Sequence, residues 1–215
     1  MGLPYATVDV LRQHWWNKST SILRERRKEV HGMEAEYQRY DGVTAKTVAD
    51  ELVGTYSEVY SVPPYVDDPF FTVDMFGDRL HRAFGMPGFE TVTARVDGQV
   101  VGLVHGVTLM ADKPWWVSLD DRAGDKLRTA VENGEVFWLR ELMVRPKYGR
   151  QGLGRQLHDT IIAGREETAT ALTCVIGNEP AHSAYLRWGY RIMGQIKHAP
   201  ESPVYDAMVL SSHPM

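Results

Sequence analysis

The residues best suited to chemistry lie in a glycine-rich, basic stretch in the middle of the chain. Residues 148–155 read YGRQGLGR and contain three glycines. An apolar run ends at Pro146 just before them, and apolar residues follow at Leu153, Leu157 and Ile161. This pattern predicts a buried strand, a turn and a helix. The first turn of a helix has unpaired N–H groups and partial positive charge, and glycines allow close approach, so the stretch is suited to binding an anion such as phosphate.

The glycine spacing distinguishes this stretch from two common phosphate-binding loops. It lacks the Gly-Lys-Ser/Thr ending of nucleoside-triphosphate loops and the Gly-x-Gly-x-x-Gly of dinucleotide folds. It resembles instead the acetyl-CoA pyrophosphate loop of the GNAT family of N-acetyltransferases, Gln/Arg-x-x-Gly-x-Gly/Ala. Gly152 and Gly154 match the two glycines, and Arg150 and Gln151 fill the variable pair. Gly149 departs from the usual Gln or Arg, and Arg150 would supply the missing charge from the next position.

A second segment resembles the same family. Residues 178–190 read NEPAHSAYLRWGY and fit the pattern Asn-x-x-Ala-x-x-x-Tyr-x-x-x-Gly-Phe/Tyr. The residues that fall in register are Asn178, Ala181, Tyr185, Gly189 and Tyr190. Two motifs in the right order are far more specific than either one, and the resemblance covers roughly residues 37–210.

The resemblance implies a fold, a co-substrate and a reaction. The fold would be α/β (α+β), with a mixed, mostly antiparallel central sheet and helices on both faces. Acetyl-CoA would donate an acetyl group directly to a primary amine within a ternary complex. Tyr185 would protonate the departing thiolate, and the backbone of residues 142–144 would follow the pantetheine arm and polarise the thioester carbonyl. The residues expected to bind acetyl-CoA are Leu142, Met143, Val144, Gly149, Arg150, Gln151, Gly152, Leu153, Gly154, Arg155 and Asn178.

Glu141 is the main candidate for the general base that takes the proton from the amine. Strand parity places it on one face with Phe137, Leu139 and Met143, whose apolar side chains would raise the carboxyl pKa by desolvation. A bulge in this strand would change that parity. The alternative role for Glu141 is an ion pair with a neighbouring arginine. His105 is a second candidate base, but a packed strand histidine is the favoured interpretation.

Other segments predict the elements that must position these residues. A helix is expected from Thr7 to about His31, within an N-terminal extension of residues 1–35, and the acetyltransferase domain would span 36–215. Asp97-Gly98 between two β-branched runs predicts a hairpin. The remaining expected elements are strands at 37–41, 135–144, 170–176, 191–198 and 204–210 and helices at 44–60, 68–84, 153–161 and 180–188. Four aromatic residues could line the acceptor site, although their helical spacing is also typical of a core: Tyr56, Tyr60, Tyr65 and Phe70.

Residues 111–134 form an insertion that is too long for a simple connection between strands. A helix is expected there from Ser118 to Val131. Its tryptophans, Trp115 and Trp116, predict a packing or lid role. Its acidic residues are those of a solvated surface helix or of a lid over the substrate. These acids, with the net charge of −4, predict a small cationic amine as acceptor.

Composition restricts the class of protein and its partners. The chain has 215 residues, of which 43% are hydrophobic and 24% charged, as in an ordinary globular protein. The net charge argues against a general nucleic-acid binder. A lone cysteine, Cys174, excludes an internal disulfide and fits a reducing compartment. No signal-peptide pattern or membrane-length apolar run is present, so we expect a cytoplasmic protein with no membrane partner. We also expect no metal site.

Two other functions stay open from the sequence. One is a non-catalytic acyl-CoA-binding or regulatory module, against which Tyr185 argues. The other is a toxin-like acetyltransferase acting on aminoacyl-tRNA, which the negative net charge disfavours. The adjacent Trp15 and Trp16 predict that the N-terminal helix docks on the body of the protein, with an arm of a homodimer as the alternative.

Overall fold

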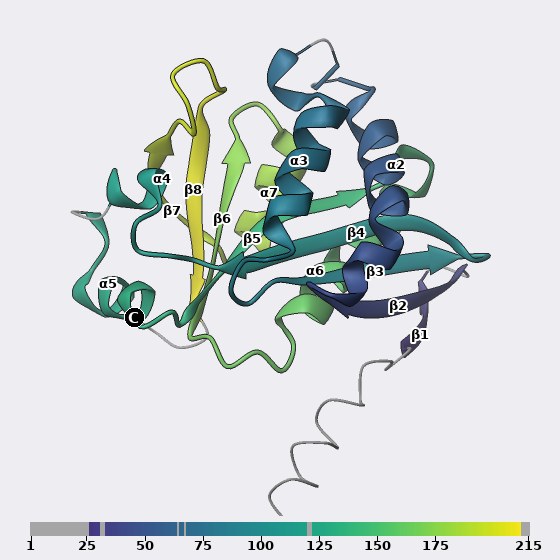
Figure 1. Cartoon of the computed structure of the whole chain (residues 1–215), viewed down its shortest axis with the longest axis horizontal. Helices are drawn as coiled ribbons and strands as arrows, with labels where there is room; N and C mark the ends of the chain where they lie inside the picture. Colours follow the sequence, from purple (N-terminus) through teal and green to yellow (C-terminus); the bar gives the residue numbers. More distant parts are fainter. Residues whose placement is uncertain (1–25, 31–32, 64, 67, 120–121, 212–215) are drawn as a thin grey trace, which may run out of the picture.

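Eight strands of this chain join into a single mixed sheet, seen in a computed structural model (Figure 1). The structure describes residues 26–30, 33–63, 65–66, 68–119 and 122–211. The strand order is β1-β2-β3-β4-β5-β6-β8-β7, and every neighbouring pair is antiparallel except β5 and β6. The expected mixed, mostly antiparallel sheet is confirmed. The strands are β1 Arg26–Val30, β2 Met33–Asp41, β3 Glu90–Val96, β4 Gln99–Thr108, β5 Val136–Val144, β6 Ala169–Val175, β7 Arg191–Ile196 and β8 Tyr205–Ser211.

Helices cover both faces of the sheet because each presents one apolar stripe. The helices α2 (Ala49–Tyr60) and α3 (Val73–Ala83) pack on one face, and α6 (Leu153–Ile162) and α7 (Glu179–Arg187) pack on the other (Figure 1). The stripe of α6 is the one expected from the sequence, and its members Leu153, Leu157 and Ile161 are fully buried. The α2–α3 face and the α6–α7 face therefore have separate apolar cores.

The insertion packs on the same face as α2 and α3, over a different part of the sheet. Outside residues 120–121, which the structure does not describe, it forms the short helices α4 (Pro114–Val117) and α5 (Asp125–Glu132), rather than the single helix expected over 118–131. Trp115 and Trp116 are buried in the core of this face, and Trp115 lies 5.5 Å from Trp138 between ring centroids. The packing role predicted for the tryptophans is therefore what the structure shows.

Several element boundaries differ from those expected. Residues 26–30 form β1, which pairs with β2, so the predicted helix does not extend to His31; its part over residues 7–25 lies outside the described residues. Pairing with β1 and β3 also lengthens the strand expected at 37–41 into β2. The helix expected from residue 68 begins with a 3-10 turn at Pro69–Phe71, and α3 starts after Thr72, whose side chain caps it. His198 lies beyond the end of β7.

The β3–β4 hairpin forms as the sequence predicts. Its turn residues Asp97 and Gly98 have φ angles of 50° and 78°, the left-handed pair that a two-residue turn between twisted strands requires. Among the described helices, none combines the length and the apolar character that crossing a lipid bilayer would require.

Candidate active site

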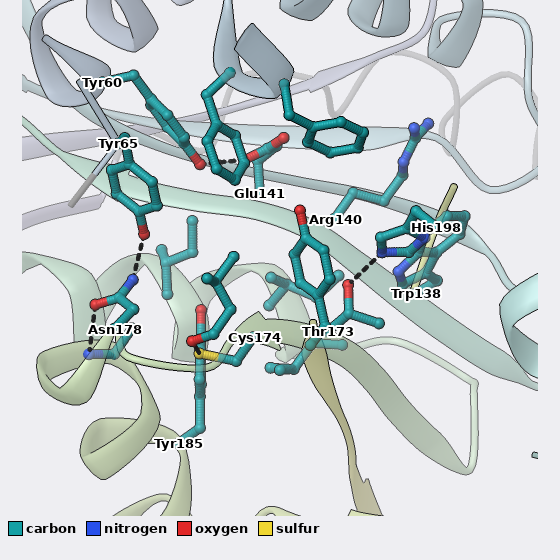
Figure 2. Close-up of a pocket in the computed structure, with 18 of the residues that line it drawn as sticks. Tyr60, Tyr65, Trp138, Arg140, Glu141, Thr173, Cys174, Asn178, Tyr185 and His198 are labelled. Carbon is teal, nitrogen blue, oxygen red and sulfur yellow. Dashed lines mark hydrogen bonds between the residues drawn. The ribbon is translucent and has the colours of Figure 1, made fainter. Parts of the chain in front are cut away.

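The strands β5 and β6 separate partway along their length. Their parallel pairing is confined to Val136–Trp138 of β5 and residues 169–171 of β6. Beyond that point β5 stays paired with β4, and β6 stays paired with β8. A cavity of about 240 Å³ occupies the opening (Figure 2). It is lined by residues 138–142 of β5, residues 172–175 of β6, the α2–α3 region, α7 and the β7–β8 loop.

A β-bulge sets the direction of Glu141. In the β4–β5 register His105 pairs with Glu141, but Gly106 pairs with Leu139, so Arg140 is the extra residue. The bulge is accommodated at Gly106, where a Cβ atom would meet Trp138 O at 2.4 Å.

The bulge corrects the predicted parity of β5. Glu141 shares the α2–α3 face with Met143, as expected, but Phe137 and Leu139 lie in the core of the α6 face. The groups around the Glu141 carboxyl are therefore the aromatic and basic side chains of α2 and α3, rather than the predicted apolar row.

The Glu141 carboxyl is held by two side chains from those helices. The Tyr60 hydroxyl donates to Oε2 at 3.2 Å, as Figure 2 shows, and Arg79 Nη2 lies 3.5 Å from Oε1. The Glu141 side chain is only 16% exposed. Burial raises the pKa of this carboxyl, although Arg79, Arg140 and the Tyr60 hydrogen bond each act to lower it. The arginine neighbour considered as an alternative is present, but its single contact is at the limit of hydrogen bonding.

Stacked tyrosines form one wall of the cavity. The ring centroids of Tyr60 and Tyr65 are 4.3 Å apart, and those of Tyr56 and Tyr60 are 3.9 Å apart. Tyr60, Tyr65 and Phe70 line the cavity, whereas Tyr56 is fully buried behind it. Of the four aromatic residues named from the sequence, three thus reach the cavity and one is core.

A buried arginine at the end of β5 fixes α2 against the sheet. Arg145 donates to the carbonyl of Val100 through Nε at 2.7 Å and forms an ion pair with Glu58 of α2. Its Nη2 also reaches Thr55 Oγ1 at 3.4 Å. These contacts hold the end of α2, and with it Tyr60, over Glu141.

Tyr185 enters the cavity from α7. Asn178 caps this helix by accepting from the N–H of Ala181 at 3.4 Å, and Asn178 also donates to the Tyr65 hydroxyl (Figure 2). Tyr185 is 8% exposed, and burial raises its pKa well above 10, so the phenol is protonated at neutral pH. Cys174 of β6 lies beside it, and burial raises the pKa of that thiol to about 12.

The glycine-rich stretch forms the predicted turn before α6. Gly152 is the N-cap residue at φ 81°, and no side chain caps the helix. Its left-handed conformation favours glycine, and Arg150 also has a positive φ of 61°. The uncapped N-terminus leaves backbone donors available to an anion, so the turn fits a pyrophosphate. By contrast, Gly149 has an ordinary φ of −64°.

The predicted site residues divide into two groups. Glu141, Leu142, Asn178 and Tyr185 line the cavity. Met143 and Val144, at the end of β5, do not line it. The turn residues 149–155, which follow β5, do not line it either. The side-chain amide of Asn178 is engaged by Tyr65 and by the cap of α7, so its contacts are with the protein itself.

Sequence reasoning missed several residues that line the cavity. Arg79, Arg140, Thr173 and His198 come from four different elements, and only Arg140 had a local signal, its position next to Glu141. His198 contacts Thr173 Oγ1 at 3.1 Å, and partial burial with the nearby arginines lowers its pKa to about 4.

His105 is packed rather than poised to act as a base. It is 2% exposed, lies between Phe76 and Phe89 and does not line the cavity. Within the described ranges, its ring nitrogens have no hydrogen-bond partner, and no group of His, Cys, Asp and Glu could hold a metal ion.

Comparison with known protein families decides which class of protein this is. A family model described as the acetyltransferase (GNAT) family matches residues 45–190, which is most of the chain. The chain belongs to this family. As a GNAT protein it is an N-acetyltransferase that uses acetyl-CoA. No curated protein sequence matches the chain significantly.

Solved structures share the fold at low sequence identity. Protein PH1933 from Pyrococcus horikoshii OT3 has a TM-score of 0.58 and 18% identity, covering 84% of this chain and 100% of its own. The PaiA N-acetyltransferase from Thermoplasma acidophilum, in complex with coenzyme A, has a TM-score of 0.53 and 12% identity, with coverage of 83% and 99%. The ribosomal-protein-S18-alanine N-acetyltransferase from Escherichia coli has a TM-score of 0.55 and 14% identity, with coverage of 82% and 93%.

Proposed function

We propose that this GNAT protein acetylates the primary amine of a small molecule by direct transfer in a ternary complex. The observation that supports this most is the cavity between β5 and β6, which receives a largely buried carboxyl, Glu141, and a protonated phenol, Tyr185, from different elements (Figure 2). Direct transfer needs a proton acceptor for the amine and a proton donor for the thiolate, and these two groups have the matching chemistry.

Glu141 is the proposed general base. A carboxyl whose pKa is raised by burial accepts a proton more readily than an exposed glutamate does. As the nitrogen–carbon bond forms, the proton of the attacking amine passes to Glu141. Tyr60 and Arg79 orient the carboxyl toward the cavity.

Tyr185 is the proposed general acid. Its phenol stays protonated because burial raises its pKa well above 10. As the carbon–sulfur bond breaks, the phenol gives its proton to the departing sulfur and later recovers one from solvent. Acetyl-CoA supplies the activated acyl group, and the uncapped turn before α6 would hold its pyrophosphate. The unpaired edge of β5 beyond Trp138 would follow the pantetheine arm.

A covalent route through Cys174 is disfavoured by the burial of its thiol. The thiol lines the cavity, but its pKa of about 12 keeps it neutral, and the thiolate is the nucleophilic form. Cys174→Ser is therefore expected to keep its activity.

The acidic residues of the insertion, which suggested a cationic acceptor, do not support that charge. Asp125 and Glu132 of the insertion are exposed and do not line the cavity. The charged groups that do line it are Arg79, Arg140 and Glu141.

Initial-velocity kinetics test the proposed transfer. Rates are measured while acetyl-CoA is varied at several fixed concentrations of a turned-over amine. Direct transfer predicts double-reciprocal lines that intersect, together with an active Cys174→Ser variant. Parallel lines, with loss of activity in that variant, would show a covalent acyl-cysteine route instead.

A further inference from the structure

The charges inside the cavity specify the acceptor more narrowly than the sequence does. Resting on the proposed function, we propose that the acceptor is a small primary amine that also carries a carboxylate, bound through the guanidinium of Arg140 with Arg79 beside it. An amino acid is the simplest molecule of this class. The inference replaces the cationic acceptor expected from the sequence.

Arg140 makes no hydrogen bond to a carboxylate of the described residues, although the Glu141 carboxyl is near enough to act on its pKa. Its contacts are Met86 Sδ at 3.6 Å from Nη1 and the Trp138 ring, whose centroid lies 4.8 Å from Cζ. Over the described ranges, Arg140 forms no ion pair. Arg140 is partly buried and is one of the residues that line the cavity. A partly desolvated arginine held against an aromatic ring keeps its planar donors in place for an incoming carboxylate.

Arg79 adds a second positive charge on the same cavity. Its contact with Glu141 is single and long, at 3.5 Å, and its Nη1 atom is buried with no hydrogen-bond partner in the described part of the chain. Two arginines and one glutamate therefore line the cavity, and a cationic ligand would meet a net positive charge. A carboxylate from the acceptor would balance the charge.

Arg140 and Glu141 are adjacent at the bulge, which fits an acceptor that carries a carboxylate and an amine close together. Arg140 precedes Glu141 on β5, and both line the cavity. A carboxylate on Arg140 would direct a nearby amine toward Glu141, where its proton is taken. The phosphates of acetyl-CoA are not the anion in question, because the turn that would bind them leads into α6, which packs on the opposite face of the sheet.

The test compares acceptors that differ only in the carboxylate. L-amino acids are assayed with acetyl-CoA alongside their carboxamides and the matching decarboxylated amines. We expect turnover with acids and a KM for the best acid at least tenfold below that of its amide. In parallel, N-acetyl-L-phenylalanine, N-acetyl-L-glutamate and their amides are titrated calorimetrically into the protein with CoA, and the acids should bind more tightly.

Variants assign the effect to the cavity. Arg140→Gln should raise the KM of the acid about 10- to 100-fold, which is the range for losing a charge-assisted hydrogen bond, and should abolish the difference between acid and amide. Arg140→Lys should restore part of it. Arg191→Gln is the matched control, because Arg191 is exposed on β7 and does not line the cavity. It removes the same charge and should leave the preference unchanged.

The outcomes separate this inference from the proposed function. Amides or simple amines acetylated as well as the acids, with an unaltered ratio in Arg140→Gln, would overturn the carboxylate but leave direct transfer standing. If no amine were acetylated, the proposed function would fail, and the calorimetric comparison of N-acetyl acids with amides would still decide the anion site. Equal binding of acid and amide there would refute it.

Discussion

Replacing Glu141 with glutamine removes the proposed base and little else. Glutamine has nearly the same size and keeps an oxygen that can accept the hydrogen bond from Tyr60. The contact with Arg79 is single and long, so its loss should disturb the fold little. The change also lies away from the turn before α6, so acetyl-CoA should bind as before.

The expected loss follows from the role of a positioned base. General-base help contributes about 10²–10⁴-fold, which at 1.36 kcal/mol per tenfold is about 2.7–5.4 kcal/mol of transition-state stabilisation. Burial raises the carboxyl pKa, so the acidic limb of kcat/KM should lie above the usual glutamate value of 4.5. Activity falls below that pKa because the carboxyl is then protonated and cannot take a proton. Glu141→Gln should lower kcat/KM and lose this limb.

The assay is a pH profile of kcat/KM for both proteins, with acetyl-CoA affinity measured separately. Glu132→Gln is the matched control, because Glu132 is exposed on α5 and does not line the cavity. A Glu141→Gln variant within twofold of the wild type, with the same acidic limb, would refute the base. Loss of acetyl-CoA binding or a large fall in melting temperature would point to the ion-pair role instead.

Three further substitutions probe the surroundings of the cavity and the turn. Tyr185→Phe should lower kcat by roughly 10²-fold with acetyl-CoA affinity kept, since it removes only the donated proton; full activity, or an equal loss of binding and rate, would assign Tyr185 to packing. Tyr60→Phe should move the acidic limb to higher pH, because the Tyr60 hydrogen bond holds the pKa of Glu141 down and its removal lets that pKa rise. An unmoved limb would contradict this contact. Gly152→Val should abolish the thermal shift with acetyl-CoA, since a β-branched residue is strained at φ 81°, whereas Gly124→Val, which meets open space, should keep it.

Local patterns predicted most of the sheet and its helices. Asp97-Gly98 predicted the hairpin because two left-handed residues are what such a turn needs. Leu153, Leu157 and Ile161 predicted α6 because one apolar stripe is enough to bury a helix. The β1 strand was not predicted, since residues 26–30 become a strand by pairing with β2, which is a tertiary contact.

The direction of Glu141 shows why the site was harder to predict than the fold. Strand parity alone put Glu141 with Phe137 and Leu139, and one inserted residue, Arg140, reversed that relation. The sequence carries a weak trace of the bulge in Gly106, which no residue with a Cβ atom could replace. Arg79 and His198 reach the cavity from segments distant in the chain, so no spacing rule could associate them with Glu141.

Release of free CoA thiol from acetyl-CoA, measured with and without amines, tests the central claim most directly. The assay uses a library of amino acids, their amides, simple amines, polyamines and peptides, and mass spectrometry of the products. Direct transfer predicts thiol release that depends on the amine, equals the amount of acetylated amine and falls about 10²–10⁴-fold in Glu141→Gln.

Direct transfer would be contradicted by binding of acetyl-CoA without turnover. Acetyl-CoA at a hundred times its dissociation constant should stabilise the fold by about 2.7 kcal/mol. If that stabilisation were seen while no amine raised thiol release above the protein-free rate, the cavity would bind an acyl-CoA without transferring its acyl group, and the proposed roles of Glu141 and Tyr185 would be wrong.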